Sequence, residues 1–265
     1  MIIGAVGAVC GIGGGLFAVP LLHFGFKLPL RRAVATSLCL VFATAIASTS
    51  AEVLHAESAL LWGIVLPLIG GALVGTQFGF ALSKHVNERL LKGVFTVLLC
   101  VIGIRMLASD SVPAAAAAAS EAGFSAAVTV GLVVLGMTAG TLSPLLGIGG
   151  GLIIVPVLLM AMPEIGGNGA RSASLAIACF TSLRSVHLYM KERIVDLSVA
   201  PWIACGALLG ASLGVQFAHL PGASALGQRV FGLILLVTAA RFGKDALRQP
   251  AVVPETAAAS PSKLE

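Results

Sequence analysis

Long apolar runs, separated by short polar segments, dominate this 265-residue chain. A helix that crosses a bilayer needs roughly 20 mostly apolar residues. Seven runs approach or exceed that length, at residues 33–54, 60–82, 90–108, 124–143, 170–190, 197–218 and 226–246. Two further apolar stretches, 1–24 and 146–162, each contain a cluster of glycines. The pattern therefore predicts an all-α polytopic membrane protein.

The two glycine clusters are copies of one motif. GIGGGLFAVP at Gly11–Pro20 recurs 136 residues later as GIGGGLIIVP at Gly147–Pro156. Other positions match at nearly the same offset, including Ser37 with Ser174 and Thr44 with Thr181. The chain is therefore expected to be an internal duplication. Only ten residues precede Gly11, so the first stretch is either a short half-helix or part of a longer natural segment, and both alternatives stay open.

The duplication predicts four parts of the chain. We expect a first transmembrane repeat over residues 1–108, a linker over 109–123, a second repeat over 124–246 and a disordered tail over 247–265. The linker contains a run of six alanines, and the tail is rich in Pro, Ala and Ser.

A ladder of small residues occurs once in each half. Gly71, Gly75 and Gly79 match Gly206, Gly210 and Gly214. Glycines four residues apart on a membrane helix allow a neighbouring backbone to approach closely. Each ladder is therefore predicted to lie at a helix–helix contact.

Loop charges predict how the two halves are oriented, since cytoplasmic loops are enriched in Lys and Arg. In the first half, basic residues follow the glycine motif and the run at 60–82. In the second half, they follow the run at 170–190 and lie at the end of the run at 226–246. These residues are Lys27, Arg31, Arg32, Lys84, Arg89 and Lys92, then Lys191, Arg193, Arg241, Lys244 and Arg248. Equivalent loops thus fall on opposite faces, which predicts inverted-topology repeats, glycine-broken helices meeting near the midplane and a cytoplasmic C-terminus.

Composition narrows the class of protein. Apolar residues make up 58% of the chain and charged residues 10%, far from the values of a soluble domain. The net charge of +5 arises from basic residues at predicted membrane edges, which does not indicate nucleic-acid binding. The five cysteines lie singly in apolar runs, so we expect no metal site and no cofactor. No catalytic constellation is evident, so we do not expect an enzyme.

The glycines are the first candidates for a binding site. A helix that starts after a glycine turn presents free N–H groups and a partial positive charge, which suit an oxyanion. The alternative is that glycine only permits a tight crossing or kink. The candidate residues are Gly13, Gly14 and Gly15 in the first copy and Gly149, Gly150 and Gly151 in the second.

Hydroxyl and basic side chains are further candidates. The hydroxyl candidates lie at helical spacing and are Ser37, Thr44, Ser174 and Thr181. They either bind the anion or form hydrogen bonds to the backbone, and both interpretations stay open. Arg184, inside an apolar run, either faces the pathway or snorkels to the membrane edge. His55 and His187 occupy similar positions in the two halves and are candidates for proton coupling.

The two GIGGG…VP motifs, each followed by a Ser-Leu segment, resemble the sulfite exporter TauE/SafE family over residues 1–246. The resemblance implies a permease of the plasma (inner) membrane that exports sulfite, sulfonates or related sulfur-containing organic anions without ATP hydrolysis. Its expected partners are a small anion and the lipid bilayer. The competing hypothesis is a membrane scaffold or accessory subunit that transports nothing.

Overall fold

The computed structural model describes residues 15–54, 61–108, 126–162 and 165–196, together with short stretches between 200 and 244. Within these ranges every regular element is helical, in the order α2 (Gly15–Pro20), η1 (Leu21–Gly25), α3 (Leu30–Leu54), α4 (Trp62–Ser83), α5 (Glu88–Ala108), α6 (Ala126–Leu146), α7 (Gly151–Ala161) and α8 (Gly166–Lys191). The expected all-α class is confirmed for these residues. Gly13, Gly14, His55, the linker and the tail lie outside the described residues, as does most of 197–246.

In the described part of the chain, three helices are long and apolar enough to cross a membrane, judged by length and composition: Leu30–Ser50 within α3, Trp62–Ser83 and Ala126–Leu146. They coincide with the runs predicted at 33–54, 60–82 and 124–143. The run predicted at 170–190 is also one helix, α8, but its mean hydropathy is lowered by Arg171, Arg184, Lys191 and several serines.

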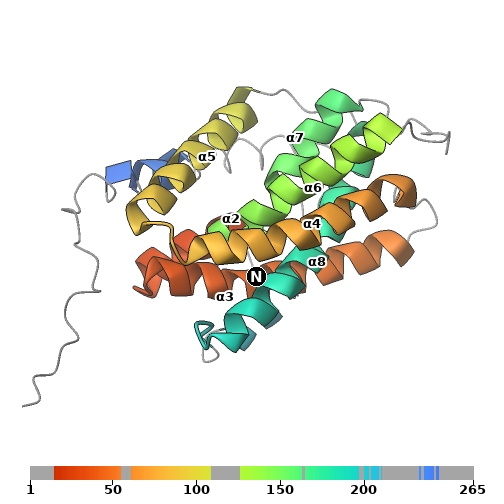
Figure 1. The fold of residues 1–265 in the computed structure, drawn as a ribbon. Helices are drawn as coiled ribbons and strands as arrows, with labels where there is room; N and C mark the ends of the chain where they lie inside the picture. Colours follow the sequence, from red (N-terminus) through yellow and green to blue (C-terminus); the bar gives the residue numbers. More distant parts are fainter. Residues whose placement is uncertain are drawn as a thin grey trace, which may run out of the picture.

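Helices α4 and α6 pack side by side along most of their length (Figure 1). A Cβ added at Gly71, Gly75 or Gly79 of α4 would lie within 3 Å of backbone atoms of α6, at Val133, Met137 and Thr141 in turn. Residue numbers increase together on both helices, so the two run parallel. The hydroxyl of Thr141 also donates to the carbonyl O of Gly75 at 3.2 Å. The prediction that this glycine ladder marks a helix contact is confirmed.

Helices α3 and α8 pack in the opposite sense. Arg31, at the start of α3, lies 3.7 Å from Glu192, just after the end of α8. Val41, in the middle of α3, packs with Ala178, in the middle of α8. The two helices are therefore antiparallel and cross near their centres.

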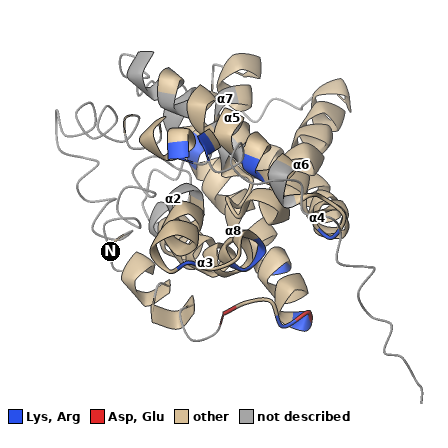
Figure 2. Cartoon of the chain, turned by 90° about the vertical axis from the view of Figure 1, so that its left-hand side faces the viewer, with Lys and Arg blue, Asp and Glu red and all other residues tan. Residues whose placement is uncertain are grey.

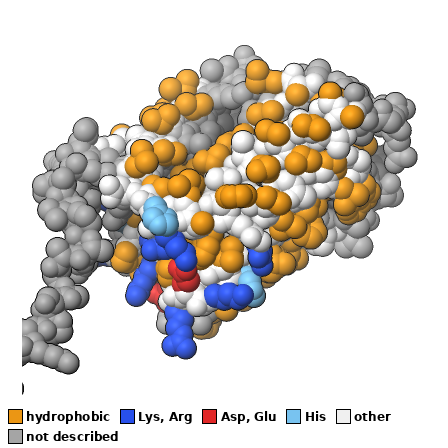
Figure 3. All heavy atoms as spheres, in the orientation of Figure 1, with side chains coloured by type: hydrophobic (Ala, Val, Ile, Leu, Met, Phe, Trp, Pro, Cys, Tyr) orange, Lys and Arg blue, Asp and Glu red, His pale blue; other side chains and the backbone are white. Residues whose placement is uncertain are grey.

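Apolar side chains cover much of the outer surface (Figure 3). Leu66 and Phe78 of α4, Val97 of α5 and Val130 of α6 are each about 60% exposed, at 61%, 63%, 64% and 62%. A surface of this kind would be unfavourable in water but suits lipid. Lys and Arg occur at only a few places along the helices (Figure 2) and gather toward one end of the bundle.

Candidate functional site

The second glycine motif forms a buried turn between α6, which ends at Leu146, and α7, which begins at Gly151. Gly147, Gly149 and Gly150 have φ values of +70°, +76° and +79°. Side chains are strained in this left-handed region, so the turn needs glycine at these positions. Gly150 is the N-cap residue of α7 and forms no side-chain cap bond. The first N–H groups of α7 therefore have no intrahelical partner and no cap from Gly150.

Three hydroxyls from two other helices hold the carbonyl groups of this turn. The hydroxyl of Ser37 on α3 is shared between the carbonyl O of Gly147 at 3.0 Å and that of Val34 in its own helix at 2.8 Å. On α8, Ser174 donates to the carbonyl O of Gly151 at 3.1 Å. Thr181 is shared between the carbonyl O of Gly149 at 2.8 Å and that of Ile177 in its own helix at 2.9 Å. All three hydroxyl-bearing residues are fully buried. The sequence makes these hydroxyls and the glycines separate candidates for a binding site, and the structure brings them together.

These contacts also determine where the N–H groups of the turn point. In a trans peptide the C=O and N–H bonds point in opposite directions. Because hydroxyls hold the carbonyls of residues 147, 149 and 151, the N–H groups of Ile148, Gly150 and Leu152 point away from those hydroxyls. A hydroxyl has one hydrogen, and here it is directed at a carbonyl. The N–H groups, rather than these hydroxyls, are thus the donors that remain suited to an anion.

Thr44, the fourth hydroxyl candidate, is also buried, and its one hydrogen is shared within its own helix between the carbonyl oxygens of Leu40 and Val41, at 3.1 and 2.9 Å. This contact corresponds to the backbone-bonding interpretation of the membrane hydroxyls.

Gly15, which is the described glycine of the first motif, packs against the second motif. A Cβ at Gly15 would lie within 3 Å of the carbonyl O of Gly147 and of a methyl group of Val41. A Cβ at Gly149 would lie 2.5 Å from the other methyl group of Val41 and 3.3 Å from Cβ of Ala178. The contact is therefore close-packed, at the point where α3 and α8 cross.

Two buried hydroxyls near this turn were not singled out from the sequence. Ser143 and Ser185 are fully buried, and neither hydroxyl has a hydrogen-bond partner among the described residues. Ser185 lies one helical turn from Thr181, which bonds Gly149, and one turn from Tyr189, which bonds Pro144. Unpaired buried hydroxyls are costly, so each marks a polar position in an otherwise apolar interior.

The basic candidates lie along one side of α8. Arg184 is partly buried, whereas His187 and Lys191 are exposed. Within the described part of the chain Arg184 has no hydrogen-bond or ion-pair partner. In the same part no group of His, Cys, Asp and Glu side chains could hold a metal ion.

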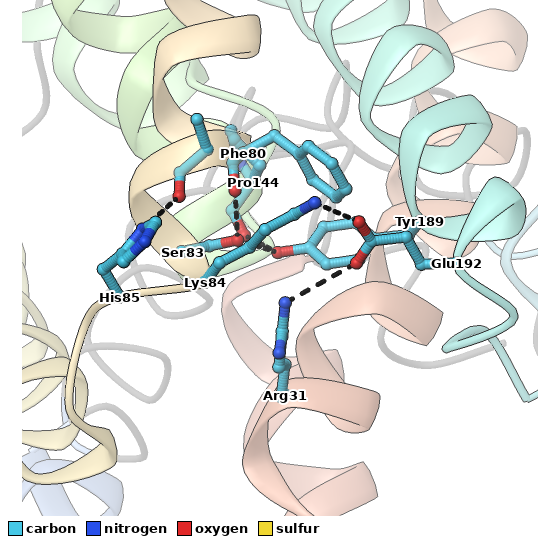
Figure 4. Close-up of polar contacts among 9 residues, drawn as sticks. Arg31, Phe80, Ser83, Lys84, His85, Pro144, Tyr189 and Glu192 are labelled. Carbon is cyan, nitrogen blue, oxygen red and sulfur yellow. Dashed lines mark hydrogen bonds and ion pairs between the residues drawn. The ribbon is translucent and has the colours of Figure 1, made fainter. Parts of the chain in front are cut away.

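A polar cluster ties four helices together at the charged end (Figure 4). Glu192 pairs with Lys84, which follows α4, and with Arg31 of α3. The hydroxyl of Tyr189 donates to the carbonyl O of Pro144 at 2.8 Å and lies 3.2 Å from Oγ of Ser83. The segments around Arg31 and Lys191, which the loop charges predict to be cytoplasmic, lie at the same end of the bundle, since Glu192 directly follows Lys191. The roles of Tyr189 and Glu192 carried no signal in the sequence.

Comparison with known proteins identifies the family. A model described as "Sulfite exporter TauE/SafE" matches residues 132–263. A "Probable membrane transporter protein" of Xylella fastidiosa is 32% identical over 249 residues, which cover 89% of this chain and 90% of that protein. The chain belongs to the TauE/SafE family. Other relatives of this TauE/SafE chain are also described as probable membrane transporter proteins. One, from Methanocaldococcus jannaschii, is 28% identical, and the match covers 81% of this chain and 82% of that protein. Another, from Bacillus subtilis, is 25% identical, and the match covers 89% of this chain and 96% of that protein. No solved structure matches.

The TauE/SafE assignment, together with the apolar helices, makes the chain a membrane transporter. Membership in a transporter family also favours a non-enzymatic role for the buried glycine turn.

Proposed function

We propose that this protein is a secondary transporter that exports sulfite, sulfonates or related sulfur-containing organic anions across the plasma (inner) membrane. The observation that carries the proposal is the uncapped start of α7 in the middle of the bundle, where hydroxyls hold the carbonyls of the turn and leave its N–H groups as donors. An oxyanion is the ligand that such a helix end favours.

The surrounding charge supports an anion. Residues 126–162, which form α6, the glycine turn and α7, contain no Asp, Glu, Lys or Arg. The field at the turn is therefore set by peptide dipoles, without a carboxylate to repel an anion. Arg184 adds a positive charge on α8, one helical turn beyond Thr181, and Gly13 and Gly14 complete the proposed site in the first motif.

The antiparallel crossing of α3 and α8 supports the inverted repeat. Val41 and Ala178 meet at the crossing. They are separated in sequence by the same number of residues as Ser37 and Ser174, which are matched positions of the duplication. A two-fold axis in the membrane plane relates equivalent helices in this antiparallel way. We infer that residues 1–108 and 124–246 are the two repeats and that the charged end, including the C-terminus, faces the cytoplasm.

The coupling ion is part of the same proposal. His187 is exposed near the charged end and is a candidate to carry a coupling proton together with His55.

Flux of a labelled anion through purified protein tests the proposal against the scaffold hypothesis. Proteoliposomes that contain only this polypeptide should transport radiolabelled sulfite or taurine, with sulfoacetate, sulfate and acetate as competitors. A scaffold would transport none of them. Preference for a cation, or no anion transport at all, would overturn the assignment.

A matched pair of glycine variants links flux to the turn. Gly150→Ala should abolish most of the flux, because φ is +79° there and the new Cβ would lie 2.8 Å from the carbonyl O of Ala139. The control is Gly131→Ala on the exposed side of α6, where a Cβ would meet nothing within 4 Å. Equal flux through the two variants would show that the turn is not part of the pathway.

A further inference from the structure

The polar cluster at the charged end connects two helix pairs. We call it the clamp and define it as Arg31, Ser83, Lys84, the carbonyl group of Pro144, Tyr189 and Glu192 (Figure 4). One pair is α4 with α6, joined backbone to backbone through glycines. The other pair is α3 with α8, which cross at Val41 and Ala178. The clamp joins side chains of the second pair to the ends of the first.

Tyr189 is the buried centre of the clamp, at 1% exposure. Its ring packs edge-on against Phe80 of α4, with the ring centroids 5.0 Å apart. Pro144 lies in the last turn of α6, where carbonyl groups have no intrahelical N–H partner. The hydroxyl of Tyr189 supplies that partner from α8, three residues before the glycine turn begins at Gly147.

Glu192 forms the outer layer of the clamp. Its carboxylate pairs with both Arg31 and Lys84, and its side chain is 30% exposed. The ammonium group of Lys84 also lies 4.9 Å from the centroid of the Phe80 ring. Ion pairs at this exposure are individually weak and screened by salt. They are therefore suited to break and form again during a transport cycle.

The opposite end of the contact between α4 and α8 is different in kind. There Ile64 and Val65 of α4 share an apolar cluster with Ala170 and Ala173 of α8. Such a contact has no directional bonds, so the helices can tilt about it while the polar end separates. At the clamp, by contrast, hydrogen bonds and ion pairs between specific residues hold the two helix pairs together.

We propose that the clamp is the gate that closes the transport path at the charged end, and that opening requires the Tyr189 hydroxyl to leave Pro144. This inference rests on the proposed transport function. Release of Pro144 removes the bond between α8 and the last turn of α6, so gate and site are coupled through the three residues of chain that lead to Gly147.

The native thiol of Cys39 provides a reporter for this gate. Cys39 of α3 packs against the cluster that contains Phe80 and Tyr189. The other four cysteines, Cys10, Cys100, Cys179 and Cys205, are replaced by serine. A membrane-impermeant methanethiosulfonate is then applied, without substrate, to everted and to right-side-out vesicles, and the rate of Cys39 modification is measured.

Tyr189→Phe removes the hydroxyl and keeps the ring against Phe80. Loss of one such hydrogen bond should raise the modification rate in everted vesicles by roughly two- to tenfold. Glu192→Gln should raise the modification rate less than Tyr189→Phe does. High salt should raise the rate of the unsubstituted protein toward the rate of Glu192→Gln. The control is Thr138→Val, whose hydroxyl is exposed and bonds only its own helix, at Leu135; its rate should not change.

An unchanged rate in Tyr189→Phe, or an equal rise in Thr138→Val, would overturn the gate. A rise in right-side-out vesicles alone would support the gate and overturn the cytoplasmic orientation proposed for the charged end. Labelling uses no substrate, so this result is independent of flux. Absence of anion flux with a shifted labelling rate would refute the substrate assignment and leave the clamp as the element that controls opening.

Discussion

Replacement of Gly75 by alanine tests whether close backbone packing holds α4 against α6. The added Cβ would lie within 3.0 Å of three backbone atoms of Met137, its O, C and Cα. Backbone atoms of a helix cannot rotate away as a side chain can, so the two helices must separate. Overpacking of this kind costs about 1–3 kcal/mol. The separation should also lengthen the 3.2 Å hydrogen bond from Thr141 to the carbonyl O of Gly75.

Gly70→Ala is the matched control, five residues away on the same helix. Gly70 is exposed, and a Cβ there would meet nothing within 4 Å. Since alanine is the better helix former by about 1 kcal/mol, this variant should be as stable as the unsubstituted protein or more stable. The two variants change the same atoms in the same helix and differ only in what the new methyl group meets.

Thermal unfolding in detergent gives the comparison. A thiol-reactive fluorophore that reports exposure of the partly buried Cys39, Cys100 and Cys179 should show a lower midpoint for Gly75→Ala and no decrease for Gly70→Ala. Equal midpoints for the two variants would refute the close packing of α4 on α6.

Two further variants test the surroundings of the glycine turn. Thr181→Val should lower the free energy of unfolding by about 1–3 kcal/mol and reduce flux, because the buried carbonyl of Gly149 loses its donor. The control is Thr138→Val, which should change neither quantity in the same unfolding and flux assays. Arg184→Gln should leave the unfolding midpoint within the range of an ordinary surface substitution, since Arg184 has no partner among the described residues, but should weaken anion binding measured by competition in proteoliposomes. Unchanged binding in Arg184→Gln would favour the snorkelling interpretation.

The long helices could be predicted from the sequence because a membrane span leaves a strong local signal. The run predicted at 60–82 is α4 (Trp62–Ser83), and the run at 90–108 is α5 (Glu88–Ala108). The glycine ladder was equally local: a spacing of four residues puts Gly71, Gly75 and Gly79 on one face of a helix, and that face packs against α6.

Contacts between distant parts of the chain could not be predicted in the same way. Tyr189 and Pro144 are separated by 45 residues, and nothing in either segment indicates that a hydroxyl of one meets a carbonyl of the other. Ser143 and Ser185 resemble any small residue of an apolar helix in sequence, and their unpaired hydroxyls became evident only in the packed structure. For Ser37 and Thr181, the residues were predictable but not the direction of their hydrogen bonds.

That direction changes how an anion would be held. If the hydroxyls of Ser37, Ser174 and Thr181 bound the anion directly, their hydrogens would have to leave the buried carbonyls of the turn, and each carbonyl would then lose its partner. Binding through the N–H groups of the turn breaks no such bond, because the hydroxyls and the anion would act on opposite ends of the same peptide units. The hydroxyls therefore act best as positioning groups, which fix the peptide planes so that the N–H groups are aligned before the anion arrives.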